Sequence, residues 1–166
     1  MVMFGISELE GKTTTMPRIP KSNPRYRTKS ELCGELAFVL NSNLHYGTKH
    51  AVLLEATWVW TEFEGKYEGC EHWSEAALEF RGQPQMLIHE HVIPKKVVIE
   101  LLLKLPNPTT GSVHQLLESF CKGVVITKEE DTRLNRLGLR SKMPSDWDGK
   151  DLWARYTVAK IVLKKA

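Results

Sequence analysis

Apolar residues recur at helical spacing over much of the chain and predict a mostly helical protein. Residues at i, i+3, i+4 and i+7 line one face of an α-helix. The clearest such stripe follows Pro94 and comprises Val97, Val98, Leu101, Leu102 and Leu105. Pro94 suits a helix start, because its ring fixes φ and its missing N–H would have no partner there. Similar stripes predict helices over residues 30–40, 49–63, 73–80, 112–122 and 128–137.

Two shorter apolar stretches have the composition of strands. Residues 86–92 are flanked by prolines, and residues 124–126 are all β-branched, as buried strands often are. Alternate side chains of a strand face opposite ways, so His89 and His91 share one face and Glu90 lies on the other. Several predicted helices and only two short predicted strands indicate the α+β class. We expect a mostly helical domain with a small β-sheet.

Polar residues at fixed spacing mark where two of the helices begin. Ser112 with Gln115, and Thr127 with Glu130, have the spacing of capping boxes, in which each side chain bonds the other residue's backbone N–H. Near the end of the chain, residues 153–163 alternate only in part. That segment predicts either a closing strand or a short helix that packs on the core.

The first 29 residues differ from the rest and predict an N-terminal arm ahead of one globular domain at 30–166. Between residues 12 and 29 no acid occurs, and the basic residues are Lys12, Arg18, Lys21, Arg25, Arg27 and Lys29. Three prolines in this segment favour an extended chain. Two interpretations stay open: the arm lies along a phosphate backbone, or it is a solvated tail.

Composition places the chain among ordinary globular proteins. Its 166 residues suit one core, and 42% of them are hydrophobic and 26% charged. The net charge of +3 permits a polyanionic partner without requiring one. The three cysteines are far apart and form no CxxC pair, which argues against a disulfide framework or a cysteine zinc cluster. With no apolar run of membrane-spanning length, we expect a cytoplasmic protein with no membrane partner.

The densest chemistry in the chain is His89-Glu90-His91, at the end of a predicted strand. A neutral histidine can accept a proton near pH 7, and a carboxylate can hold a hard cation. The same three residues could equally be packing groups, with one histidine in the core and the other near the start of the next helix.

These residues resemble a nuclease motif. The sequence Glu90-His91-Val92-Ile93-Pro94 resembles the acid-His-aliphatic-aliphatic-Pro signature of the HNH nucleases, also called the ββα-metal or His-Me finger class. Residues 126–131, with Leu134 and Asn135, look like the second half of some phage-type members, in which a strand leads through Thr and paired acids into a short helix. The resemblance covers residues 86–138 and implies a ββα core. In the family the two strands form a tight hairpin, whereas here about 30 residues with two predicted helices lie between them.

The resemblance implies a metal-dependent endonuclease or phosphodiesterase acting on DNA or RNA. His91, with His89 beside it, would be the catalytic base that activates a water. Glu90, Asp131 and the amide oxygen of Asn135 would hold one Mg²⁺ or Mn²⁺ ion against the scissile phosphate. Further phosphate contacts would come from Lys95, Lys96, Arg133, Arg136 and Arg140.

Two other functions fit the same residues. One is a non-catalytic protein of a phage or mobile element that binds a host protein or a nucleic acid as an inhibitor or regulator. The other is a different hydrolase or transferase that uses the His89/His91 pair, which predicts a deep apolar pocket beside His89. The chain has no phosphate-cradling Gly-rich loop, dinucleotide fingerprint or HExxH motif, which argues against nucleotide-dependent and thermolysin-like activities. Its oligomeric state is left open.

Overall fold

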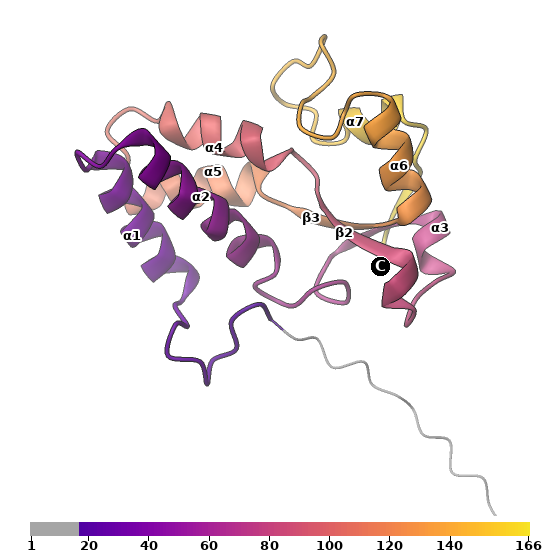
Figure 1. Ribbon diagram of the computed structural model, residues 1–166, viewed down its shortest axis with the longest axis horizontal. Helices are drawn as coiled ribbons and strands as arrows, with labels where there is room; N and C mark the ends of the chain where they lie inside the picture. Colours follow the sequence, from indigo (N-terminus) through magenta and orange to yellow (C-terminus); the bar gives the residue numbers. More distant parts are fainter. Residues whose placement is uncertain (1–16) are drawn as a thin grey trace, which may run out of the picture.

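Four helices form one layer of the protein. In the computed structural model, which describes residues 17–166, they gather on one side of the molecule (Figure 1). They are α1 (Lys29–Asn41), α2 (Tyr46–Thr61), α4 (Lys95–Leu103) and α5 (Thr110–Phe120). Helix α1 contacts α2 and α5, and α4 also contacts both of those helices. None of the helices in residues 17–166 is long and apolar enough to span a bilayer.

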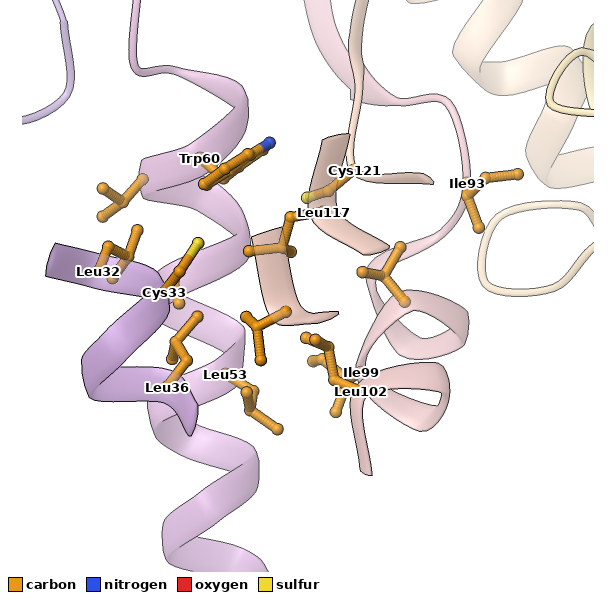
Figure 2. Packing of buried hydrophobic residues seen from close by; sticks show 14 of the residues in the cluster. Leu32, Cys33, Leu36, Leu53, Trp60, Ile93, Ile99, Leu102, Leu117 and Cys121 are labelled. Atoms are coloured by element: carbon orange, nitrogen blue, oxygen red, sulfur yellow. The ribbon is translucent and has the colours of Figure 1, made fainter. Parts of the chain in front are cut away.

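The core of this helical layer is built from the apolar stripes of the four helices. Leu32 and Leu36 of α1 belong to the same buried cluster as Leu53 of α2 and Leu117 of α5 (Figure 2). Ile99 and Leu102 of α4 complete the cluster. Every one of these side chains is at most 1% exposed. Burying a large aliphatic side chain contributes about 1.5–3 kcal/mol, so this cluster is the main apolar reason that the layer holds together.

A four-stranded mixed sheet forms the second part of the molecule. Its strands are β1 (His72–Ser74), β2 (Leu87–His91), β3 (Gly123–Thr127) and β4 (Leu163–Lys165), in the order β2-β3-β1-β4. Strand β3 runs antiparallel to β2 and parallel to β1, and β4 runs antiparallel to β1. The remaining short helices are α3 (Glu75–Leu78), the 3-10 turn η1 (Pro84–Met86), α6 (Lys128–Arg136) and α7 (Ala154–Val158).

The two faces of the sheet pack on different partners. On one face, Leu87 of β2 and Val125 of β3 join Trp73 in a small cluster. On the other face, Val124 and Ile126 pack with groups from α6, α7 and the segments beside them, including Leu134, Leu139, Tyr156 and Ile161. The sheet is therefore covered on both sides, which explains why β3 is an almost continuous run of apolar residues.

The predicted α+β class and both predicted strands are confirmed. Strand β2 occupies residues 87–91 and β3 residues 123–127, and Thr127 and Glu130 form the predicted capping box of α6. The closing segment contains both a short helix, α7, and a strand, β4. Helices α4 and α5 separate β2 from β3, and α6 contacts both strands. The chain order is therefore strand, helical insertion, strand, helix.

Two local predictions were wrong. Residues 73–80 do not form one helix, because residues 72–74 are extended and pair with β3 and β4, and the helix starts only after the Ser74 cap. The capping box of α5 joins Thr109 to Ser112 instead of Ser112 to Gln115. The first error has a long-range cause, because distant strands pair with residues 72–74, and the second is a shift of the cap by one turn.

The described part of the predicted basic arm is attached to the helical layer. Arg18 pairs with Glu55 and Glu62, and Arg25 also pairs with Glu55. Similar pairs join Arg27 to Glu35 and Lys29 to Glu118. These four cations pair with carboxylates of the same chain, so residues 17–29 are attached to the helical layer. Lys12 lies outside the described residues.

Candidate functional site

Strand β2 separates the residues of the predicted nuclease centre onto two faces. His89 and His91 point toward the helical layer and are 4% and 3% exposed, whereas Glu90 points toward α6 and α7. The separation follows from the twofold alternation of a strand. The two histidines and Glu90 therefore stand in different electrostatic environments.

His91 is enclosed by the C-terminal half of α2. Its ring lies edge-on to Trp58, with 4.5 Å between ring centroids. Nε2 lies 3.4 Å from the Thr57 carbonyl oxygen and 3.3 Å from Thr61 Oγ1. A carbonyl oxygen only accepts hydrogen bonds, so the contact places the proton on Nε2. Burial is the main cause that lowers the pKa of His91 to about 3, and the imidazole is neutral at pH 7.

His89 has fewer partners than His91. Its Nδ1 lies 3.6 Å from Cys70 Sγ, and its Nε2 has no hydrogen-bond partner among residues 17–166. Gly123 makes room for the ring, because a Cβ at that position would lie only 2.7 Å from Nε2. Burial lowers the pKa of His89 to about 4 and raises the pKa of the Cys70 thiol to about 12, so both groups are neutral at pH 7. The pair lacks the thiolate that a catalytic cysteine needs.

Glu90 is held by a fully buried arginine. Arg155 Nη2 donates to Glu90 Oε1 at 2.7 Å, and Nη1 donates to the His91 carbonyl oxygen at 2.8 Å. Nε donates to the Leu139 carbonyl oxygen, also at 2.8 Å. Burial raises the pKa of the Glu90 carboxyl, and the guanidinium opposes that rise. This network joins the end of β2 to the segment after α6, which is a structural role for Glu90.

The predicted metal ligands do not converge with the histidines. Asn135 Nδ2 donates to Asp131 Oδ2 at 3.2 Å, so the two helix residues contact each other. Glu90 is occupied by Arg155, and both histidines lie across the sheet. Within residues 17–166 there is no group of three or more His, Cys, Asp or Glu side chains placed to hold a metal ion. This donor set does not fit the Mg²⁺ or Mn²⁺ centre that the resemblance implies.

Three of the five predicted phosphate-contact residues do come together. Lys95, Lys96 and Arg140 line one surface groove with a volume of about 370 Å³. Its other lining residues are His50, Leu54, Pro94, Ile99 and Ser141. The groove is assembled from α2, the start of α4 and the segment after α6. We call it the basic groove.

No carboxylate lines the basic groove within the described part of the chain, and the carboxylates that act on Lys95, Glu90 and Glu62, lie outside its lining. Lys95, Lys96 and Arg140 form no ion pair with a carboxylate of residues 17–166. Lys95 Nζ lies 3.9 Å from the centroid of the Trp58 ring. Burial lowers the pKa of Lys95. Lys96 and Arg140 are exposed and keep their charge in contact with solvent.

The other two predicted phosphate contacts lie elsewhere. Arg133 donates to the carbonyl oxygens of Ala159 and Lys160, at 3.3 and 3.4 Å, and so closes the end of α7. Arg136 is exposed on the last turn of α6 and is not a lining residue of the basic groove. The resemblance grouped five cations by sequence, and the fold assigns them to three different environments.

A second cavity, of about 170 Å³, lies beside Cys70 and Gly123. Charged side chains such as Lys29, Glu118 and Lys122 line it together with Trp60 and Phe63. It therefore differs from the deep apolar pocket that a third enzymatic interpretation predicted beside His89, and His89 itself is not a lining residue.

Sequence reasoning missed three residues that matter at these sites. Arg155 lies in the partly apolar segment 153–163, where a lone arginine is the one signal that could have identified a buried ion pair. His50 and Leu54 had no signal toward the groove, because its lining residues from the other segments are at least forty positions away in sequence.

Comparisons of this chain with protein-family models, with curated proteins and with solved structures found no match.

Proposed function

We propose that this protein binds a nucleic acid through the phosphate backbone, with the basic groove as the contact surface. The observation that carries the proposal is the convergence of Lys95, Lys96 and Arg140 from separate segments, with no carboxylate among the lining residues of the described chain. Lysine and arginine supply most protein contacts to phosphate oxygens. A surface lined by three cations, with no carboxylate among its described lining residues, suits a polyanion.

The position of the lysines gives additional support. Lys95 and Lys96 are the first two residues of α4, which has no acid in its first turn and no side-chain cap. The positive end of a helix dipole disfavours cations there, by about 0.3–1 kcal/mol each. Two lysines at this place reduce helix stability, and a phosphate seated between them would remove that penalty.

The proposal is for binding, and it assigns no cleavage step. His91 Nε2 is occupied by α2, and Glu90 is occupied by Arg155. The nuclease expected from the resemblance stays a prediction. A direct check is incubation of the complex with Mg²⁺ or Mn²⁺: metal-dependent cutting that disappears in His91→Ala would contradict a role limited to binding.

The test of the proposal is the salt dependence of binding. A fluorescent oligonucleotide should bind wild-type protein, with affinity falling as salt rises. Lys96→Glu and Arg140→Glu should each weaken binding at least tenfold, and the corresponding Gln variants should reduce the log–log salt slope by about one. Arg136→Glu is the matched control, since it makes the same charge change outside the groove. Equal losses for Arg136→Glu and Arg140→Glu would contradict the proposal.

The stability of the Lys96 variant provides an independent check. Because Lys96 opposes the helix dipole, Lys96→Glu should raise the free energy of unfolding by about 0.5 kcal/mol while it weakens binding. A variant that is more stable and binds less well cannot owe its loss of binding to misfolding.

A further inference from the structure

The floor of the basic groove is apolar, although its rim is cationic. Leu54 of α2, Pro94 and Ile99 of α4 lie between the charged groups. Leu54 is 37% exposed, whereas Pro94 and Ile99 are buried beneath the surface, so Leu54 supplies the accessible apolar part of this floor. Contact with phosphates alone needs charge and hydrogen-bond donors and gains nothing from an apolar floor. The combination of Leu54 with the cations around it suits an occupant that is apolar on one side and anionic on the other.

We propose that the basic groove accepts one unpaired nucleotide of a single strand, with its base on the Leu54 floor and its phosphates on Lys96 and Arg140. This inference rests on the proposed function and names its substrate class. The bases of a duplex are stacked inside the helix and cannot reach such a floor. An unpaired base can be turned out of the strand and held against apolar side chains.

The size and charge of the groove suit this occupant. A volume of about 370 Å³ falls in the lower part of the range of roughly 300–1,000 Å³ that small-molecule sites span. A groove of that size takes one nucleotide better than a stack of several. Arg140 and Lys96 approach it from different segments, so a phosphate on either side of the base has a cation within the groove.

The experiment separates the base from the charge. Binding of wild-type protein is measured to a short single strand of DNA, to the equivalent RNA, to the DNA strand annealed to its complement, and to inorganic polyphosphate. Leu54→Ser is compared with Val52→Ser, a matched control on the same helix that is 38% exposed and is not a lining residue. Thermal unfolding of both variants verifies that they fold.

The expected result is preference for single strands over the duplex and a loss of at least about fivefold for Leu54→Ser on single strands. The same variant should bind polyphosphate as wild type does, and Val52→Ser should resemble wild type on every probe. Equal affinity for single strand and duplex, or no effect of Leu54→Ser, would overturn the inference while the charge variants could still support backbone binding. If wild-type protein binds none of the probes, the inference and the proposed function both fall.

Discussion

The two faces of β2 bury polar groups in opposite ways. The Glu90 face pairs its carboxylate with Arg155, which also bonds the carbonyl oxygens of His91, Val92 and Leu139. The histidine face leaves His89 Nε2 without a partner among residues 17–166 and keeps both rings neutral. A charge can be buried when it is fully bonded, whereas a titratable group without an opposite charge is buried in its neutral form. One face is therefore sensitive to substitution and the other to pH.

Acidification should have the largest effect, and it acts on the histidine face. The pKa values of His89 and His91 fall to about 4 and about 3 in the folded chain, from 6.5. As the pH falls, the unfolded chain takes up these protons before the folded chain does. The contribution of the two neutral histidines to the free energy of unfolding is therefore fully present above about pH 6.5 and decreases below it. Together the two groups should lower the free energy of unfolding by about 6 kcal/mol at pH 4.

Urea unfolding at a series of pH values measures this loss. Burial raises the pKa of Glu90, so its own proton uptake favours the folded state as the pH falls and works against the histidines. The double substitution of His89→Gln and His91→Gln should flatten the profile between pH 6.5 and pH 4. A wild-type profile that is already flat over that interval would show that the histidines are not buried neutral.

Arg155→Met should have the next largest effect, and it acts on the Glu90 face. The change leaves Glu90 without its cation and three carbonyl oxygens without their donor. Breaking one partner of a buried ion pair costs about 3–5 kcal/mol, and chemical denaturation at pH 7 measures it. Arg133→Met is the control, since its exposed guanidinium also bonds two carbonyl oxygens. That variant should cost about 1 kcal/mol.

A second substitution distinguishes the unpaired charge from lost packing. Replacing Glu90 by Leu in the Arg155→Met background should restore part of the stability, because no unpaired carboxylate remains. Purely additive losses in this double-mutant cycle would mean that the pair is not coupled.

Gly123→Ala should have an intermediate effect on the histidine face. Its new Cβ would lie 2.7 Å from His89 Nε2 and 3.1 Å from Cys70 Sγ. Overpacking of this kind costs about 1–3 kcal/mol, as thermal or chemical unfolding can measure. Gly111→Ala on α5 meets only Thr109 Oγ1 at 3.8 Å and should be neutral or stabilising. Similar unfolding curves for the two variants would place His89 farther from Gly123.

Thr61→Ala should have the smallest effect. It removes one of the two oxygen atoms near His91 Nε2, and the Thr57 carbonyl oxygen stays at 3.4 Å. With one acceptor retained, the loss should be about 1 kcal/mol or less. A loss as large as that of Arg155→Met would mean that the histidine face depends on a complete hydrogen-bond network after all.

Local signals explain which parts of the fold could be predicted. The strand at 87–91 lies between prolines, and Thr127 caps α6 through a residue only three positions away. Strand β1 is three residues long and exists because β3 and β4 pair with it, so no pattern within residues 72–74 could identify it. Ser74 is the true cap of α3, but Trp73 fits the apolar face of a helix, and the predicted helix therefore began before that cap.

The candidate site, like the fold, could be predicted only in part from the sequence. Five candidate phosphate-contact residues could be named from the sequence. Which three of them line the basic groove could not be predicted, because that depends on where α2 and the segment after α6 meet α4. The alternation of β2 already placed Glu90 opposite the histidines. The metal centre implied by the resemblance required all of them on one side, and the fold does not bring them there.

The order of pairing in the sheet bears on how the chain folds during synthesis. The four long helices come from residues 29–120 and contact one another, so we expect their layer to assemble before β3 has left the ribosome. Strand β1 gains its second neighbour only when β4, at residues 163–165, emerges. Until then β1 is an open edge able to pair with another nascent chain. We therefore expect crowded polysomes to favour aggregation through the sheet, and not through the helices.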